Sequence, residues 1–195
     1  MIKIGIDVGS TTAKLVAVDE NDNLLFSKYE RHNAKAKETI LSFLKELLSE
    51  IGDKDISVRI TGSIGMGISE KCSLPFVQEV VAAAKAIQKD YSHVTSMIDI
   101  GGEDAKVVVF KDAEATDLRM NGNCAGGTGA FIDQMAIILG VNIDELNQLA
   151  MNATQVYPIA SRCGVFCKTD IQNLIAKNVS RENIAASIFR AVAVQ

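Results

Sequence analysis

The sequence predicts an α/β fold made of two similar lobes, and three observations lead to that prediction. Short segments in which apolar residues alternate with other residues indicate strands, and longer segments with an apolar stripe at helical spacing indicate helices. The third observation is a repeat, because Ile6-Asp7-Val8-Gly9 and Ile98-Asp99-Ile100-Gly101 have the same pattern in the two halves of the chain. An internal duplication explains this repeat most simply.

The first lobe, over residues 1–92, is predicted to begin with three strands joined by tight turns. The turn residues, at 9–12 and 21–23, are Gly, Ser, Thr, Asn and Asp, which favour reversals of the chain. A helix follows with its apolar stripe between Ile40 and Ile51, and Gly52 is placed to end it. The other predicted elements are strands at Ile2–Val8, Lys14–Val18, Leu24–Tyr29 and Ile56–Ile60, and a helix at Glu79–Asp90.

The second lobe, over residues 93–195, is predicted to repeat this order and then to add helices. It has fewer strands than the first lobe, and its last helix runs to Gln195 without a stop signal. We therefore expect the chain to be a fragment of a longer protein. The predicted strands are Thr95–Ile100, Lys106–Phe110 and Glu114–Met120, and the predicted helices are Thr128–Leu139, Asp144–Asn152, Thr169–Lys177 and Glu182–Val194.

The charge balance argues against a nucleic-acid-binding protein. The 195 residues include 20 Lys and Arg against 24 Asp and Glu, a net charge of −4, and the basic residues are scattered. The longest apolar runs are too short to cross a bilayer, and the chain starts with a strand pattern instead of a signal peptide. We expect a soluble, cytoplasmic protein without a nucleic-acid or membrane partner.

The chain has four cysteines, Cys72, Cys124, Cys163 and Cys167. A chain of this length with a full apolar core does not need disulfides, and the expected compartment is reducing. No C-x-x-C pair is present, which argues against a zinc ribbon or a thioredoxin-like site. Free thiols, or ligands to a soft metal or cluster, are the remaining interpretations, and Cys72 is expected to be structural.

Glycines indicate the first candidate site, in the segment from Asp7 to Lys14 between two predicted strands. Gly9 permits a tight turn, so that backbone N–H groups and the neighbouring hydroxyls can hold phosphate oxygens. Asp7, at the end of its strand, can hold a magnesium ion through water. A plain hairpin turn with Ser and Thr as turn formers is the alternative. The predicted phosphate contacts are Gly9, Ser10, Thr11, Thr12 and Lys14.

The segment from Asp99 to Lys106 is a second hairpin of the same kind. Two equivalent turns, one in each lobe, would grip a triphosphate from both sides of a cleft. The pair is much less expected by chance than either turn alone, so we interpret both as phosphate-binding. The predicted residues of this second turn are Asp99, Gly101, Gly102, Glu103, Asp104 and Lys106.

Other nucleotide-binding patterns are absent from the sequence. Thr61–Gly67 follows a predicted strand, but its glycine spacing is G-x-x-G-x-G and not the dinucleotide spacing G-x-G-x-x-G. No Walker A pattern occurs. His32 and His93, the two histidines, lie far apart in sequence, and we expect both to be surface residues.

With two further segments, Met120–Gly129 and Ile159–Phe166, the hairpins resemble a known family. The hairpins alone resemble the two phosphate motifs of the actin, sugar-kinase and heat-shock-chaperone ATPase superfamily. All four segments together look like the activator of 2-hydroxyacyl-CoA dehydratases, and the ATP-binding subunits of benzoyl-CoA reductase are similar. The resemblance covers essentially the whole chain. It implies an actin-like (ribonuclease H-like) ATPase with two duplicated lobes, the second C-terminally incomplete.

The resemblance implies an iron–sulfur protein. Members of the family form homodimers, or pairs of like subunits, that share one 4Fe–4S cluster through two cysteines from each subunit. Cys124 and Cys163 match those ligands. Each precedes a predicted helix, whose free N–H groups would stabilise a thiolate. A buried, inert thiol is the alternative for each. Cys167 stands where many members have another residue, so it is a small apolar filler or a spare ligand.

The resemblance also implies how the parts act together. ATP or ADP with Mg²⁺ would bind between the lobes, with Asp7, Asp99 and Glu103 as catalytic residues. Glu103 stands where relatives often have Gln, and either side chain can orient the attacking water. Hydrolysis would change the lobe angle and move the cysteine-bearing helices. One electron from a ferredoxin or flavodoxin would then pass to a CoA-ester dehydratase or reductase.

Two other functions stay open, and one expected feature is missing. A small-metabolite kinase of the same superfamily would need an acceptor-activating carboxylate and no cluster. A non-catalytic nucleotide-binding scaffold module would bind without turnover and would not need either cysteine. In this superfamily a glycine-rich stretch that holds the adenosine follows the last helix, and none is present here. If nothing follows, we expect weak or absent ATP affinity.

Overall fold

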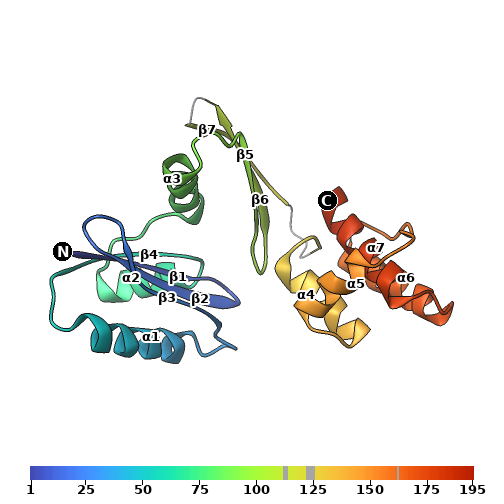
Figure 1. The fold of residues 1–195 in the computed structure, drawn as a ribbon, viewed down its shortest axis with the longest axis horizontal. Helices are drawn as coiled ribbons and strands as arrows, with labels where there is room; N and C mark the ends of the chain where they lie inside the picture. Colours follow the sequence, from blue (N-terminus) through green and yellow to red (C-terminus); the bar gives the residue numbers. More distant parts are fainter. Residues whose placement is uncertain (112–113, 122–125, 162) are drawn as a thin grey trace. The chain divides into compact units, whose positions relative to one another are not determined.

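A computed structural model of the chain describes residues 1–111, 114–121, 126–161 and 163–195 (Figure 1). The chain divides into two compact units, Met1–Val94 and Thr95–Gln195. Each unit combines one sheet with helices, so the predicted α/β class is confirmed. The interpretation of the two units as duplicated lobes stays a prediction. In the described part of the chain, no helix is long and apolar enough to cross a membrane.

The first unit contains a four-stranded sheet in the order β3-β2-β1-β4. Strand β1 (Ile2–Val8) pairs antiparallel with β2 (Thr12–Val18) and parallel with β4 (Ile56–Thr61). Strand β3 (Leu24–Arg31) lies at the edge next to β2. The predicted N-terminal meander is therefore confirmed, and its first turn lies at the carboxyl end of β1.

Alternation along β1 creates the core of this unit. Its even-numbered residues, from Ile2 to Val8, are buried, while Lys3 and Gly5 are exposed. Helix α1 (Ala36–Ile51) lies along the sheet, as Figure 1 shows, and its buried residues join the same apolar cluster. The buried residues of α1 are Ile40, Phe43, Leu47 and Ile51.

The first unit has two more helices, one of them not predicted. Helix α2 (Gly65–Cys72) lies where the sequence indicated only a glycine-rich turn. Helix α3 (Glu79–Asp90) has the predicted bounds.

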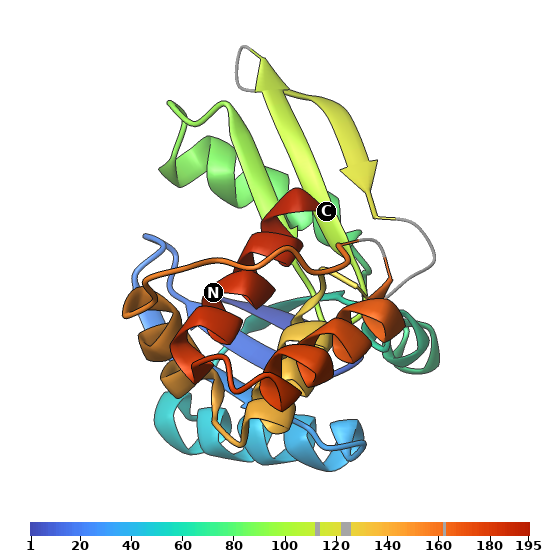
Figure 2. The same ribbon diagram turned by 90° about the vertical axis from the view of Figure 1, so that its right-hand side faces the viewer.

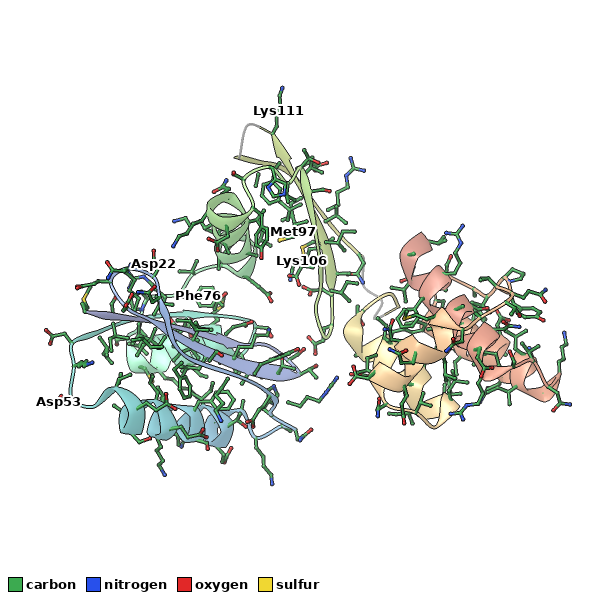
Figure 3. The ribbon with its side chains drawn as sticks, in the orientation of Figure 1. Asp22, Asp53, Phe76, Met97, Lys106 and Lys111 are labelled. Carbon is green, nitrogen blue, oxygen red and sulfur yellow. The ribbon has the colours of Figure 1, made fainter. Side chains whose placement is uncertain are left out.

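The Lys89 ammonium of α3 lies 2.6 Å from the carboxylate of Asp22, labelled in Figure 3. Hydrogen bonds from Lys89 and then from Lys3 lower the pKa of Asp22 to about 2.

The second unit begins with an antiparallel sheet in the order β5-β6-β7. The strands are β5 (Ser96–Ile100), β6 (Ala105–Lys111) and β7 (Glu114–Met120). Along β6, Lys106, Val108 and Phe110 are buried and the residues between them are exposed. The turn between β5 and β6 contains Gly101 and Gly102.

Four helices follow in the described part of this unit: α4 (Gly129–Leu139), α5 (Ile143–Met151), α6 (Gly164–Ala176) and α7 (Arg181–Val194). They share one apolar cluster, and Figure 2 shows α6 and α7 side by side. The largest fully buried side chains of this cluster include Met135, Leu146, Ile171, Ile184 and Ile188. Helix α6 begins at Gly164, five residues before the predicted start.

Candidate functional site

The first predicted phosphate site is the turn between β1 and β2, called here hairpin 1 (residues 7–14). Asp7 lies opposite Lys14 in the antiparallel register. The Gly9 N–H donates to the carbonyl oxygen of Thr12 at 3.0 Å and so holds the turn. Residues 9–12 are half-buried, which leaves the turn within reach of a ligand.

The two carboxylate oxygens of Asp7 differ in their hydrogen bonding. Its Oδ2 accepts a hydrogen bond from Lys14 Nζ at 2.6 Å. Burial alone would lower the pKa of Lys14, but the hydrogen bond and charge of Asp7 outweigh it and raise that pKa. Among the described residues, Asp7 Oδ1 has no hydrogen-bond partner although it is buried, and the same is true of Oγ1 of Thr61, which lies opposite Asp7 on β4. These two oxygens fit a hydrated Mg²⁺, whose bound water would donate to them.

Gly62 allows the turn after β4 to close against hairpin 1. Its φ is +92°, a conformation that side chains rarely adopt. A Cβ at this position would collide with the carbonyl of Val8 and lie 2.6 Å from Asp7 Oδ1. The Ile64 N–H also donates to the Val8 carbonyl at 3.0 Å. Hairpin 1 is therefore fixed from the β4 side by close backbone packing.

His32 is buried against hairpin 1, so the expectation of a surface histidine was wrong. Only 5% of the residue is exposed. Its Nε2 lies 3.0 Å from the carbonyl oxygen of Gly9, and its backbone N–H donates to the carbonyl of Thr11 at 3.2 Å. His32 directly follows β3, whose Arg31 lies opposite Thr12, so the register of the sheet places His32 beside the turn. The other histidine, His93, is exposed as predicted.

The second predicted site, called here hairpin 2 (residues 99–106), has the same register as hairpin 1. Asp99 lies opposite Lys106, and the Gly101 N–H donates to the Asp104 carbonyl at 2.8 Å. A Cβ on Gly101 would lie 2.7 Å from Asp104 Oδ1, so a larger residue would disturb this turn. Glu103 is exposed in the turn.

The lysines of the two hairpins differ in burial. The side chain of Lys106, labelled in Figure 3, is 5% exposed, whereas that of Lys14 is 40% exposed. Lys106 Nζ lies 3.0 Å from Oδ2 of Asp104 and 3.8 Å from Oδ2 of Asp99. The ammonium of Lys106 is thus held inside the protein by carboxylates. Its predicted contact with phosphate stays a prediction.

Helix α4 and the residue after β7 are bound to hairpin 2. The N–H groups of Gly129 and Ala130, at the start of α4, donate to the carbonyls of Gly101 and Gly102 at 2.8 and 3.2 Å. Asn121 accepts from the Ala105 N–H through Oδ1 at 2.9 Å. The segment between Asn121 and Gly129 contains Cys124, which lies outside the described residues. Both flanks of that segment are therefore hydrogen-bonded to hairpin 2.

These contacts correct one expectation about Cys124. The start of α4 was expected to offer free N–H groups to its thiolate. Gly129 and Ala130 instead donate to hairpin 2, and the Phe131 N–H donates to Thr128 Oγ1 at 3.4 Å. The first N–H groups of α4 therefore already have partners within the second unit.

Cys163 is the N-cap residue of α6 and carries a free, half-buried thiol. No side chain of the described residues caps this helix, and its first turn contains no acidic residue. A thiolate here would lie at the positive end of the helix. The exposed side chains of Val165 and Phe166 follow in the first turn. Cys163 therefore fits the role of an anionic thiolate ligand.

The other two described cysteines differ from Cys163. Cys167 is 1% exposed within the helical core, and burial, with a smaller contribution from the charge of Asp170, raises its pKa to about 11. This environment favours the predicted apolar filler over a spare ligand. Cys72 is exposed at the end of α2. Within the described residues, no group of three or more His, Cys, Asp or Glu side chains could hold a metal by itself.

Sequence reasoning missed three residues that support the hairpins: Gly62, His32 and Asn121. Gly62 had a signal, since an isolated glycine directly after a strand marks a close backbone approach. Asn121 stands within the Met120–Gly129 motif, but its bond to Ala105 is a tertiary contact. His32 lies 23 residues from Gly9 and carried no local signal.

The chain matches the model of the BadF/BadG/BcrA/BcrD ATPase family over residues 4–195. The 2-hydroxyisocaproyl-CoA dehydratase activator of Clostridioides difficile is 31% identical over 206 residues, which cover 99% of this chain and 73% of that protein. The chain therefore belongs to this ATPase family, as the sequence motifs predicted.

Two solved structures are similar to the chain along its whole length. One is the activator of the 2-hydroxyisocaproyl-CoA dehydratase from Clostridium difficile with bound ADPNP, at a TM-score of 0.88 and 30% identity. The other is component A of the Acidaminococcus fermentans (R)-2-hydroxyglutaryl-CoA dehydratase, at 0.89 and 28%. The chain is covered completely in both comparisons and spans 73% and 75% of those chains.

Proposed function

We propose that this member of the BadF/BadG/BcrA/BcrD ATPase family activates a CoA-ester dehydratase or reductase by ATP-dependent transfer of one low-potential electron. One observation carries the proposal. Both units contain an Asp-x-Gly turn with Asp opposite Lys in the same register and with the same closing hydrogen bond from the glycine N–H. The names of the relatives, which are activators of CoA-ester dehydratases, support the substrate class of the partner.

The proposed ligand of the two hairpins is ATP or ADP with Mg²⁺. Gly9, Ser10, Thr11 and Thr12 would hold one side of the phosphate chain, and Gly101 and Gly102 the other. The bound ion would neutralise phosphate charge and strengthen the electrophilic character of the γ-phosphorus. Asp7 and Asp99 would hold water molecules in the shell of that ion. The unpartnered Oδ1 of Asp7 supports this role.

Glu103 is proposed to orient the water that attacks the γ-phosphorus. Its side chain is exposed in the turn of hairpin 2 and is not used by the core. A carboxylate can accept a hydrogen bond from that water and so direct the oxygen lone pair in line with the leaving β-phosphate oxygen. Hydrolysis then yields ADP and inorganic phosphate, with the proton released to solvent.

Cys124 and Cys163 are the proposed cluster ligands, two from each of two like subunits. A 4Fe–4S cluster held there would supply a one-electron carrier of low potential. The position of Cys163 at the start of α6 supports the role of a cluster ligand, because the positive end of the helix favours a negatively charged group. A ferredoxin or flavodoxin is the proposed electron donor, and the dehydratase or reductase component is the proposed acceptor.

Hairpin 2 is proposed to link the nucleotide to the segment that carries Cys124. The hydrogen bonds from Gly129, Ala130 and Ala105 support such a link, because any shift of the turn carbonyls changes the start of α4. The exchange of ATP for ADP would thus alter the surroundings of one proposed ligand.

Anaerobic reconstitution with iron and sulfide tests the proposal. We expect the wild-type protein to show a broad charge-transfer absorbance near about 400 nm that Cys124→Ala and Cys163→Ala lose. Cys72→Ala is the matched control, because Cys72 is free and exposed but is not a proposed ligand. A wild type without this absorbance, or retention of it in both ligand variants, would contradict the cluster and favour the kinase or scaffold function.

A further inference from the structure

His32 holds one particular carbonyl of hairpin 1. The imidazole Nε2 lies 3.0 Å from the carbonyl oxygen of Gly9, and the residue is almost fully buried. The backbone N–H of His32 holds a second carbonyl of the turn, that of Thr11, at 3.2 Å. Side chain and main chain of one residue therefore fix two peptide units of the turn, the one between Gly9 and Ser10 and the one between Thr11 and Thr12.

Fixing the Gly9 carbonyl also fixes the N–H group of Ser10. A trans peptide unit is planar, and its C=O and N–H groups point in opposite directions. Because the Gly9 carbonyl points to the His32 ring, the Ser10 N–H points away from that ring. An N–H group turned outward in this way can donate to a phosphate oxygen. Without the bond, the peptide unit could rotate and present its carbonyl, which repels phosphate.

The contact also selects the tautomer of the ring. A carbonyl oxygen can only accept, so Nε2 carries a hydrogen. Nδ1 of His32 is buried and has no hydrogen-bond partner among the described residues. A hydrogen on Nδ1 instead of Nε2 would leave a buried donor unsatisfied and the Gly9 carbonyl without this donor. The tautomer with its hydrogen on Nε2 is therefore the form that fits.

In hairpin 2, the carbonyl at the position equivalent to Gly9 accepts a hydrogen bond from a different kind of donor. Gly101 corresponds to Gly9 in the shared register, and its carbonyl accepts from the Gly129 N–H at 2.8 Å. The two turns thus have the same peptide unit fixed from outside, by an imidazole in one unit and by a helix N-terminus in the other. This recurrence indicates that the orientation of that unit matters for both turns.

We infer that His32 is a positioning residue for nucleotide binding, which keeps the Ser10 N–H directed at a phosphate of the ligand. The inference rests on the proposed function, since it assumes that hairpin 1 binds phosphate. It adds a residue outside the hairpin and outside the four motifs of the sequence analysis. His32 acts through Gly9 and does not itself touch the nucleotide.

Three substitutions of His32 distinguish the effect of losing its hydrogen bond from the effect of losing the volume of its ring. The amide nitrogen of Gln is as many bonds from Cα as Nε2 of His, so His32→Gln can keep the bond. His32→Asn places its amide nitrogen at the position of Nδ1 and cannot reach Gly9. His32→Leu fills the space without any donor. MgADP affinity is measured for each variant by calorimetry, with adenosine as the ligand that has no phosphate.

We expect His32→Leu and His32→Asn to weaken MgADP binding about tenfold, the factor that matches one net hydrogen bond. His32→Gln should bind MgADP within about threefold of the wild type. Adenosine affinity should not change in any variant. Equal MgADP binding by His32→Leu and the wild type would overturn the inference, and so would equal losses for MgADP and adenosine, which indicate a general structural defect.

The outcomes for the wild type keep the two proposals apart. A full-length wild-type protein that does not bind MgADP contradicts the proposed function itself. A wild type that binds MgADP while His32→Leu binds it as tightly contradicts only the role of His32. Nitrogen NMR of the imidazole tests the geometry without any nucleotide: we expect a protonated Nε2 and an unprotonated Nδ1, and the opposite tautomer would overturn the inference.

Discussion

Hairpins 1 and 2 have the same turn but different supports. Each has Asp opposite Lys and a glycine N–H that closes the turn. Hairpin 1 is held by the side chain of His32 and by the tight approach of Gly62. Hairpin 2 is held by the start of α4 and by Asn121. The first set of supports belongs to the four-stranded sheet and its core, whereas the second set flanks the segment with Cys124.

This difference indicates that the two turns have different roles. A turn fixed by burial and backbone contact has little freedom to change, so hairpin 1 is suited to hold the ligand in place. Hairpin 2 is joined to the start of α4 by two hydrogen bonds, so a change at the turn also changes the start of that helix. The predictions below test whether the two turns differ in these ways.

The largest effect is expected at Gly62. In Gly62→Val, the new side chain would stand on a residue with φ +92° and would collide with the Val8 carbonyl. We expect this substitution to destabilise the protein by about 3 kcal/mol or more and to abolish nucleotide binding. Urea unfolding gives the free energy. Gly67→Ala is the control, since a Cβ there meets open space within α2 and should add about 0.5–1 kcal/mol. A Gly62→Val protein of wild-type stability would show that hairpin 1 is not fixed by this contact.

The next largest effect is expected from replacing the hairpin lysines, Lys106 and Lys14, which should differ in their contributions to the free energy of unfolding. Lys106→Met removes a buried ammonium and leaves Asp104 without its partner, so we expect a loss of about 2 kcal/mol. Lys14→Met breaks an ion pair whose lysine is 40% exposed and should cost less than about 1 kcal/mol. Urea unfolding of both variants gives the comparison. Equal losses would mean that burial does not distinguish the two hairpins.

A smaller effect is expected at the start of α4. In Gly129→Ala the new Cβ would lie 3.1 Å from the Gly101 carbonyl oxygen, so the helix start must move by a few tenths of an ångström. We expect a loss of about 1 kcal/mol in thermal or urea unfolding. Gly164→Ala, at the start of α6, is the matched control, because its Cβ makes ordinary contact with Phe131 at 3.4 Å. A harmless Gly129→Ala would argue against a tight link to hairpin 2.

The smallest effect concerns alkaline pH. The folded pKa of Lys14 is raised above 10.5, so its contribution to stability is complete below that pH and is lost as pH rises through the raised pKa. The raised pKa of Cys167, about 11, also lowers the stability of the protein as the pH rises from about 9 to about 11, because the thiol ionises first in the unfolded chain. The difference between wild type and Lys14→Met isolates the lysine. If the two urea midpoints fall in parallel above pH 10.5, Lys14 does not contribute.

Local sequence signals were sufficient to predict the strands and both hairpins. Alternation along β1 and β6 gave the sheets, and the glycines gave the turns. Helix α2 was missed because Gly65 and Gly67 disfavour helix on propensity, which packing overrides here. The start of α6 was placed too late because Gly164 resembled a turn residue.

The supports of the site could not be predicted in the same way. The bond between His32 and Gly9 spans 23 residues, and the bond between Gly129 and Gly101 spans 28. Such contacts depend on how the elements pack, and a single sequence contains no periodic signal for them. The roles of the hairpin residues and of Cys124 stay predictions.

Peptide-resolved hydrogen exchange with and without Mg-nucleotide tests directly whether the two hairpins form one nucleotide site. We expect slower exchange in residues 9–12 and 101–104 when MgADP or a non-hydrolysable ATP analogue is added. It also predicts that exchange at Gly129 and Ala130 differs between these two nucleotides, while the start of α1 stays unchanged. Protection of neither hairpin, or of one alone, would contradict a nucleotide site built from the pair.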